Sequence, residues 1–450
     1  MVMLNESNGH ESVTNGDNAD CLSPSDCLIE IRCRNGKAKS LVLEKLEVII
    51  RFAAQLQTIP NQRSMLFEKL QAECDIEQIY GADSAVIKDS IVSMRFESIR
   101  AAEGVNLRLL FKESNFSFDV GNVRVYTTND DGALSQSLSA DESSEESVVG
   151  SLLWQLPCTQ FEGIWESLIY EDRLKNKLLS FAYEIIDLSD CGVDLHILNI
   201  NRLILLHGHP GTGKTSLCKA LAQSLSIQLN HRFLRSAFIE INSHSLFSKW
   251  FSESGKLVMR IFDQIEELAN DKKCLVFVLI DEIESLGMSR QRSSASNEPV
   301  DAIRAVNALL TQIDRIRRNS NVLIMCTSNM DNSLDSALMD RIDFAQSVGL
   351  PGSKAALAIL QGCISELSRI GKVNDTNECL NGNTDNEAQK RLMKLAEEAA
   401  DKLSARSIRQ IPVLACALAH KKSISLNKYV DFLELAMKEK LKKSDIPKSN

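Results

Sequence analysis

The chain has 450 residues, enough for two or three domains, and 44% of them are hydrophobic, an ordinary proportion for a globular protein. Its longest apolar stretch, residues 274–280, is far too short to cross a bilayer, and the polar first twenty residues do not resemble a signal peptide. We therefore expect a soluble protein without a membrane partner. The net charge of −9 argues against direct nucleic-acid binding. Twelve cysteines without C-x-x-C or zinc spacing indicate reduced thiols in the cytosol or nucleus.

The N-terminal part of the chain predicts a disordered lead-in over 1–24 and a small α+β domain over 25–127. Apolar patterns there predict strands at 27–34, 90–96, 105–111 and 123–127, and helices over 41–56 and 64–78. This domain shows no catalytic constellation, so we expect it to serve recognition or scaffolding. Residues 128–151 carry six acidic and no basic side chains between Asn129 and Ser147, which favours a flexible linker.

The next part of the chain, 152–352, predicts an α/β domain with a parallel sheet. Its strands are expected at 203–206, 238–241, 275–280 and 322–327, and helical patterns lie over 171–186, 216–225, 257–268 and 300–314. Residues 353–443 then predict a helical lid, with helices over 388–403, 407–420 and 428–443 and an inserted polar loop at 371–386. We expect residues 444–450 to form a tail.

The motif Gly208-His209-Pro210-Gly211-Thr212-Gly213-Lys214-Thr215 lies between an expected strand and an expected helix that opens at Ser216. Its glycines let successive backbone N–H groups converge on an anion at a helix N-terminus, and Lys214 adds a positive charge for the outer phosphates. Thr215 would place its hydroxyl on Mg²⁺. A purely structural glycine-rich turn is the alternative, and the strand-loop-helix context disfavours it. Residues 208–216 are therefore candidate nucleotide-binding residues.

Two acids follow the buried strand at 275–280. Because ligands of α/β proteins bind at the carboxyl edge of the sheet, Asp281 is expected to hold Mg²⁺ and Glu282 to act as the base that orients the attacking water. The alternative is an acidic strand end capped by the next helix, but it leaves the nearby phosphate loop unexplained. His207 and His209 also flank that loop, but they have no further ligands beside them, so no metal besides Mg²⁺ is expected.

Three further side chains suit ATP hydrolysis. Asn329, just after the next strand, can hold the water or the terminal phosphate, although Asn is also an ordinary turn residue. Arg341 is either paired with a neighbouring aspartate, Asp340 or Asp343, or an arginine finger that stabilises charge on the transferred phosphate. Arg406, at the start of a lid helix, could contact the γ-phosphate.

Other phosphate-loop classes fit less well. A GTPase needs an Asn-Lys-x-Asp element, and the pairs at Asn176 and Asn427 lack the Asp, whereas a small-molecule kinase does not need the four downstream side chains. In order, Glu282, Asn329, Arg341 and Arg406 resemble an AAA+ ATPase. Two aromatic residues ahead of the loop, Trp165 and Tyr170, either pack in the core or line the base pocket.

The resemblance becomes more specific over 241–256, 276–286 and 301–314, and also takes in 161–170 and 217–223. These stretches closely resemble the pachytene checkpoint protein family, AAA+ remodellers of HORMA-domain proteins, across 152–443. The N-terminal domain agrees only in size and element order. His209 stands where this family usually has Pro, and Ala405 where Gly is usual.

The resemblance implies a homohexameric ring that uses ATP and Mg²⁺, with Arg341 reaching the ATP of a neighbouring subunit. It places Trp250 and Phe251 in the first pore loop, whereas the residues alone favour a core anchor, and it places the second pore loop at 289–299. The implied partners are HORMA-domain proteins, namely Mad2, presented by a HORMA-fold adaptor, and meiotic axis proteins. The implied outcome is conversion from closed to open conformers in the spindle assembly and synapsis checkpoints.

The resemblance also implies a location in the nucleus, at chromosomes and kinetochores, and in the cytoplasm. Two other functions are weighed against it. One is an AAA+ loader that acts on nucleic acid, which the acidic charge and the aromatic pair disfavour. The other is a nucleotide-gated scaffold that scarcely hydrolyses ATP. It is disfavoured because the chain keeps Glu282, the expected base, and Arg341, the candidate arginine finger.

Overall fold

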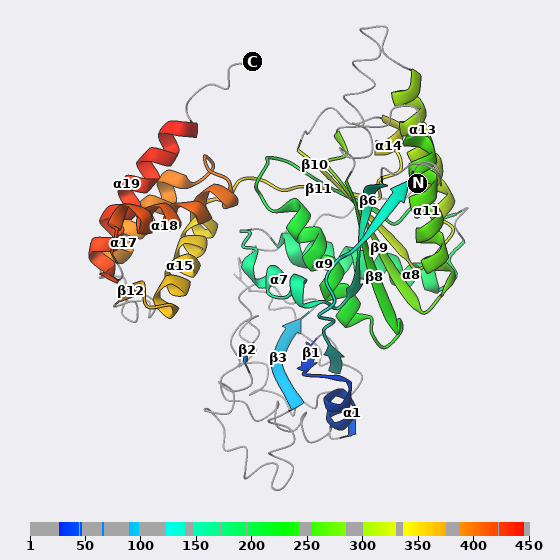
Figure 1. Ribbon diagram of the computed structural model, residues 1–450, viewed down its shortest axis with the longest axis horizontal. Coiled ribbons are helices and arrows are strands. Elements are labelled where there is room, and N and C mark those ends of the chain that lie inside the picture. The colour runs from blue at the N-terminus through cyan, green and yellow to red at the C-terminus, as the bar shows by residue number, and fades with distance from the viewer. Residues whose placement is uncertain are drawn as a thin grey trace, which may run out of the picture.

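The computed structural model describes residues 27–44, 46, 65–66, 90–98, 123–139, 147–171, 173–194, 197–242, 254–284, 300–329, 336–374, 387–421 and 423–444. These residues form an N-terminal sheet, a central α/β body and a helical lid to one side of it (Figure 1). None of the described helices combines the length and apolar character that a membrane crossing requires.

The central body is built on a seven-stranded sheet in the order β11-β7-β10-β9-β8-β6-β5. Its parallel strands are β7 (Leu203–His207), β8 (Arg235–Asn242), β9 (Cys274–Asp281), β10 (Val322–Ser328) and β11 (Phe344–Ser347). The strands β7 and β9 flank β10, so the ends of all three meet at one edge. This parallel sheet confirms the predicted fold class and brings together the residues that follow each strand.

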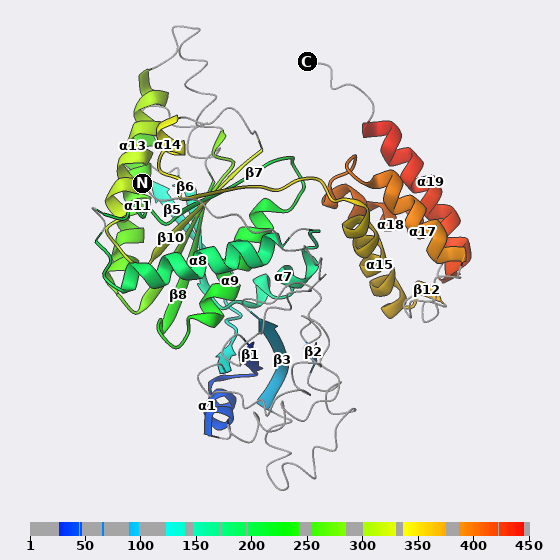
Figure 2. The same cartoon turned by 180° about the vertical axis from the view of Figure 1, so that it is seen from behind.

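Helices cover both faces of this sheet. On one face lie α7 (Ile164–Ser167), α8 (Leu174–Asp190) and α9 (Lys214–Gln228), and on the other α11 (Ser254–Asn270), α13 (Val300–Ile316) and the short α14 (Ser336–Met339) (Figure 2). Alternate strand residues point to opposite layers: Ile204 and Leu206 join the first core, Leu203 and Leu205 the second. Because both faces are covered, these strands are continuous apolar runs.

The expectation of a flexible linker over 128–151 is wrong for its described residues. β5 (Leu134–Ser139) and β6 (Ser147–Leu156) form an antiparallel hairpin, and β6 pairs with β8 from Ser151 to Leu156. The serine-rich strands and the acidic residues on either side of β5 hid this, because an edge strand can expose polar side chains to water. The ATPase sheet therefore begins at Leu134.

The N-terminal sheet has the order β2-β3-β1-β4, with β1 at Cys27–Cys33, β2 at Met65–Leu66, β3 at Ile91–Ser98 and β4 at Val123–Thr127. The predicted strands at 27–34, 90–96 and 123–127 are confirmed. Of the helix predicted over 64–78, only residues 65–66 are described, and they form β2 instead. The helix expected over 41–56 is described only at its start, as α1 (Gly36–Glu44) and Leu46. Residues 47–56 and the strand expected at 105–111 lie outside the described part. The sheet contacts α9, where Arg124 Nε donates to the Gln228 carbonyl oxygen at 2.8 Å.

The lid has a core of its own. Its helices α15 (Ser353–Arg369), α17 (Glu387–Ala399), α18 (Ala405–Ala419) and α19 (Leu426–Ser444) pack around the fully buried Tyr429. Two short strands, β12 (Val373–Asn374) after α15 and β13 (Ile424–Ser425) before α19, pair with each other within the lid. The helices predicted over 388–443 are confirmed, and α15 is an additional helix that the periodicity did not single out.

Candidate active site

The phosphate loop connects β7 to α9, as the sequence predicts. Gly208 has φ +129°, and a Cβ there would lie 2.5 Å from the Val348 carbonyl oxygen. Gly211 has φ +80°, and a Cβ there would lie 2.8 Å from the Ser404 hydroxyl of the lid. Larger residues would therefore clash with Val348, just after β11, and with Ser404 of the lid, and would also strain the backbone.

Lys214 is held by oxygen atoms at the mouth of this loop. Its ammonium donates to the carbonyl oxygens of Gly208 and His209 at 2.8 and 2.9 Å and to Asn329 Oδ1 at 2.8 Å. The side chain is only 6% exposed. Thr212 Oγ1 also donates to the His209 carbonyl at 2.9 Å. The loop thus uses the backbone carbonyl of His209, and the imidazole takes part in neither of these contacts.

The predicted magnesium pair meets at the end of β9. Thr215 Oγ1, in the first turn of α9, donates to Asp281 Oδ1 at 2.8 Å, and the Thr327 hydroxyl of β10 donates to the same oxygen. Glu282 follows with φ +56°, and its backbone N–H donates to Thr327 Oγ1 at 3.1 Å. The strained backbone turns the exposed Glu282 out of the line of the strand, beside Asp281.

Asn329 is placed by two opposite charges. Its Oδ1 accepts from Lys214, and its Nδ2 donates to Glu284 Oε1 at 2.9 Å. These partners fix which amide atom faces the phosphate loop. Glu284 is nine-tenths buried, and its Oε2 has no hydrogen-bond partner among the described residues. Glu284 was not singled out from the sequence. The signal that could have found it is its position shortly after β9, the strand beside the one that Asn329 follows.

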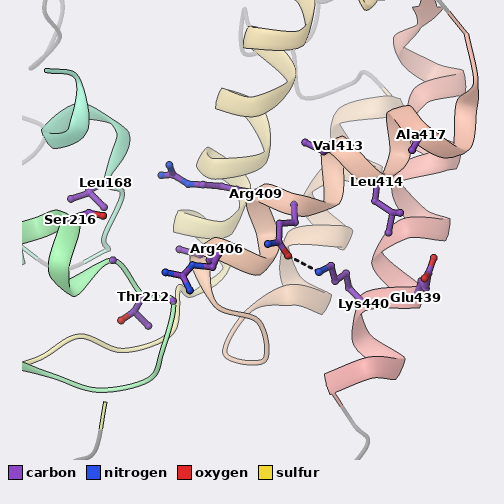
Figure 3. Close-up of a pocket in the computed structure, with 14 residues that line it drawn as sticks. Leu168, Thr212, Ser216, Arg406, Arg409, Val413, Leu414, Ala417, Glu439 and Lys440 are labelled. Atoms are coloured by element: carbon purple, nitrogen blue, oxygen red, sulfur yellow. Dashed lines mark hydrogen bonds between the residues drawn. The ribbon is translucent and has the colours of Figure 1, made fainter. Parts of the chain in front are cut away.

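A cavity of about 690 Å³ lies between the phosphate loop and the lid. Figure 3 shows Arg406 reaching from α18 toward the segment that carries Thr212, whereas Arg409, further along α18, reaches toward Leu168. The backbone N–H of Arg406 donates to the Gly211 carbonyl at 3.1 Å, and Ser404 caps α18 by accepting from the Ser407 N–H at 3.3 Å. Ala405 therefore begins a capped helix, and Arg406 lies beside the loop despite the alanine.

A second cavity, of about 330 Å³, is lined by Tyr170, Thr212 and the linker between sheet and lid. The Tyr170 hydroxyl donates to the Thr212 carbonyl at 3.2 Å, and burial raises its pKa, so it remains a phenol. Trp165 is instead 8% exposed within the first core and stacks with the Lys175 ammonium. Of the two aromatic residues, Tyr170 lines this cavity and Trp165 is a core residue.

Arg341 is paired with a different acid from those considered in the sequence. Its Nε and Nη2 donate to the two carboxylate oxygens of Asp314, at 2.8 and 2.7 Å, and its Nη1 donates to the Ala337 carbonyl at 2.6 Å. Asp343 instead accepts from the backbone N–H groups of Asn201 and Leu203. The described contacts therefore do not join Arg341 to the residues around Lys214. Trp250, Phe251 and the predicted second pore loop lie outside the described residues.

The side chains and backbone groups around the phosphate loop fit a nucleoside triphosphate with Mg²⁺. Positive φ glycines, a helix N-terminus and Lys214 suit phosphate oxygens, and the hydroxyl of Thr215 beside the carboxylate of Asp281 offers the hard oxygens that Mg²⁺ prefers. Where Mg²⁺ keeps several waters and phosphate oxygens, two protein oxygens are sufficient. Histidines 207 and 209 belong to no group of three or more metal-binding side chains within the described residues.

Comparisons with known proteins identify both ATPase subdomains. Residues 204–350 match the model of the ATPase family associated with various cellular activities (AAA), and residues 352–441 match the C-terminal lid of TRIP13-like AAA+ ATPases. The chain is 51% identical to the putative pachytene checkpoint protein 2 of Caenorhabditis elegans over 75% of its own length and 81% of the relative. It belongs to the pachytene checkpoint protein 2 family. This membership and the AAA domain make the chain a nucleotide-binding AAA+ ATPase.

Other members of the pachytene checkpoint protein 2 family give the same result. The human homologue is 42% identical over 70% of this chain and 74% of the relative. The solved structure of C. elegans PCH-2 superposes with a TM-score of 0.74 at 40% identity, over 93% of this chain and 99% of that one. A chain from the E. coli MS115-1 HORMA:CdnC:Trip13 complex shares the fold, with a TM-score of 0.50 at 18% identity over 66% of this chain and 97% of that one.

Proposed function

We propose that this AAA+ ATPase uses ATP and Mg²⁺ to remodel HORMA-domain proteins. The observation that carries the hydrolytic part is the connected edge of the sheet, where Lys214, Asn329 and Glu284 form one chain of hydrogen bonds beside the Thr215–Asp281 pair. The HORMA part is supported by family membership and by the E. coli HORMA:CdnC:Trip13 complex, one chain of which shares this fold.

The proposed hydrolysis divides the work among these residues. Glu282 accepts a proton from the attacking water, whose oxygen forms a bond to the γ-phosphorus as the bond to the ADP oxygen breaks. Lys214 and Arg406 bind phosphate oxygens, and Asn329 orients the water. Thr215 and Asp281 would hold Mg²⁺, which when bound neutralises charge on the phosphates. The tight hydrogen bonding around Asn329 orients its amide before ligand arrives.

The proposed assembly is a homohexameric ring. Arg341 would then act as an arginine finger on the ATP of the neighbouring subunit, so hydrolysis would require assembly. Trp250 and Phe251 would grip a substrate segment in the pore, and the N-terminal domain would receive the substrate or its adaptor. The contact of Arg124 with the end of α9 supports this arrangement because α9 starts at the phosphate loop and ends at the N-terminal sheet.

The proposed substrates are Mad2-type proteins, presented by a HORMA-fold adaptor, and meiotic axis HORMA proteins. The ATPase would convert them from closed, partner-bound conformers to open ones by pulling on an end of the chain. This activity would serve the spindle assembly and synapsis checkpoints in the nucleus, at chromosomes and kinetochores, and in the cytoplasm.

A release assay tests this function. A closed HORMA-domain protein carrying a fluorescent bound peptide is mixed with the ATPase, and peptide release is followed with ATP and with a non-hydrolysable analogue. We expect release only with hydrolysable ATP. A Trp250→Ala variant should keep basal hydrolysis and lose release, whereas equal release by this variant would remove Trp250 from the pore.

Measurements of ATP hydrolysis on the same proteins distinguish the two other functions. Hydrolysis stimulated by nucleic acid, with no effect of HORMA proteins, would contradict the remodelling proposal and indicate a loader. ATP binding without multiple turnovers would indicate a nucleotide-gated scaffold.

A further inference from the structure

The guanidinium of Arg341 is docked on an acid of its own subunit. Asp314, near the C-terminal end of α13, accepts from Nε and Nη2 with both carboxylate oxygens, at 2.8 and 2.7 Å. The Ala337 carbonyl of α14 accepts from Nη1 at 2.6 Å. Two elements thus fix the plane of the guanidinium as well as its position, which a single contact would not do.

This docking leaves Arg341 accessible. Its side chain is 28% exposed, and its hydrogen bonds to Asp314 and Ala337 use three of the five N–H groups of a guanidinium. The backbone beneath it is also fixed, since the Arg341 N–H donates to the Leu338 carbonyl at 3.0 Å. Two residues later, Asp343 binds the N–H of Leu203 at 2.9 Å, at the start of β7. An arginine that is both fixed and exposed can be presented to another molecule.

The ion pair itself contributes little to stability. Both side chains are partly exposed, and exposed ion pairs are weak because solvent screens them. The hydrogen bonds from Arg341 lower the pKa of the Asp314 carboxyl, so Asp314 stays ionised at neutral pH. Asp314 thus contributes little to stability but orients the Arg341 guanidinium strongly. Its role is therefore better explained by the function of Arg341 than by the stability of the fold.

We propose that Asp314 is a positioning residue, which holds Arg341 in the orientation in which it reaches the nucleotide of the neighbouring subunit. This inference rests on the proposed trans-acting role of Arg341. A free arginine side chain populates many rotamers, and hydrolysis would be slower if the side chain had to adopt one of them only at the transition state. Asp314 orders them beforehand. The opposite role, in which Asp314 restrains Arg341 from acting, would make its removal raise the rate.

Single variants measure the size of the effect. We expect Asp314→Ala to lower kcat by about tenfold, because Arg341 keeps its charge and loses its orientation, while Arg341→Ala lowers it by about 10³-fold. Asp314→Asn, with one acceptor oxygen, should fall between wild type and Asp314→Ala. KM for ATP, ring assembly and Tm should change little. Asp263→Ala is the matched control and should match wild type, since Asp263 lies on α11 and pairs at 2.7 Å with Arg315, the residue that follows Asp314 on α13.

Mixed rings separate positioning from a merely structural role. Subunits with Glu282→Gln cannot hydrolyse their own ATP but carry an intact Asp314–Arg341 pair, which they can offer to a neighbour. Mixing them with Asp314→Ala subunits should restore hydrolysis above the sum of the two separate preparations. Arg341→Ala subunits should be rescued in the same way, and co-purification of two affinity tags verifies mixing.

The outcomes are distinct. Rescue of Arg341→Ala without rescue of Asp314→Ala would overturn the positioning role and leave the trans-acting finger standing. Rescue of neither, in rings shown to be mixed, would contradict the finger and this inference together. Faster hydrolysis by Asp314→Ala would also overturn the inference, because Asp314 would then restrain Arg341.

Discussion

The two sides of the nucleotide cavity differ in how firmly their charged groups are held. At the edge of the sheet, Lys214 has three oxygen partners and Asn329 is held from both ends. On the lid, the exposed guanidinium of Arg406 makes no hydrogen bond or ion pair with the described residues, although the Arg406 backbone N–H donates to the Gly211 carbonyl of the loop. The sheet side is thus oriented in advance, whereas Arg406 can change its contacts as nucleotide binds.

This difference suggests a division between chemistry and sensing. The groups proposed to meet the transition state lie at the ends of buried strands and in the first turn of α9, and the group proposed to report nucleotide state lies on a separately packed lid. Substitutions on the sheet side should therefore lower kcat or abolish binding, and a substitution on the lid side should mainly raise KM.

The largest effect is expected for Lys214→Ala. This change removes the buried charge that faces the phosphates, and charge-assisted hydrogen bonds of about 1.5–3 kcal/mol each would be lost. We expect ATP affinity to fall by about 10³-fold in a fluorescent-nucleotide titration. Lys219→Ala is the control, because Lys219 lies on the same helix and pairs with Glu240 at 2.8 Å, outside the phosphate loop. Loss of affinity below tenfold would show that the loop backbone binds phosphate without Lys214.

A smaller effect on kcat is expected for Glu284→Leu. The substitution removes the acceptor that holds Asn329 Nδ2 at 2.9 Å, and misorienting this amide should lower kcat by about tenfold with little change in KM. Glu284→Gln keeps an acceptor oxygen and should retain most of the activity in a steady-state assay. Equal kcat values for the Leu and Gln variants would mean that Glu284 does not orient Asn329.

On the lid, Arg406→Ala should raise KM for ATP by about tenfold, the loss of roughly one charged hydrogen bond of about 1.5 kcal/mol, and change kcat less. Steady-state kinetics with Arg409→Ala as a comparison tests this, since Arg409 contacts the Ser167 carbonyl instead. If kcat falls as much as for Glu284→Leu while KM is constant, the lid arginine belongs to the chemistry and the proposed division is wrong.

The smallest effect is expected from thiol reagents. Burial raises the pKa of the Cys326 thiol on β10 to about 12, so at pH 8 only about one thiol in 10⁴ is ionised. Cys191, by contrast, is exposed. Brief alkylation of the native protein at pH 8 should modify Cys191, leave Cys326 unmodified by mass spectrometry and preserve ATPase activity. Modification of Cys326 would show that the sheet edge opens to solvent.

How far the site could be predicted depends on sequence distance. The phosphate loop and Asp281 lie directly at the ends of strongly apolar strands, so their chemistry and edge position follow from local pattern. The Glu284–Asn329 contact requires knowing that β9 and β10 are neighbours. The Asp314–Arg341 pair was missed because two aspartates closer in sequence, Asp340 and Asp343, competed as partners. Tertiary packing decided between them.

The strands β5 and β6 teach a similar lesson about the fold. Composition alone indicated a linker, but Leu134 pairs with Leu153 and Leu152 pairs with Glu240, so the hairpin extends the sheet. A polar, serine-rich edge strand such as β5 gains its order from the strand beside it, which its own residues do not reveal.

The central claim, that Glu282 hydrolyses ATP at a sheet edge already arranged to bind it, is tested most directly with Glu282→Gln. ATP affinity and single-turnover hydrolysis are measured on the same preparation. We predict ATP affinity within about threefold of wild type and hydrolysis at least about 10³-fold slower, because the amide cannot accept the proton of the attacking water. Hydrolysis within tenfold of wild type would contradict the assignment of Glu282.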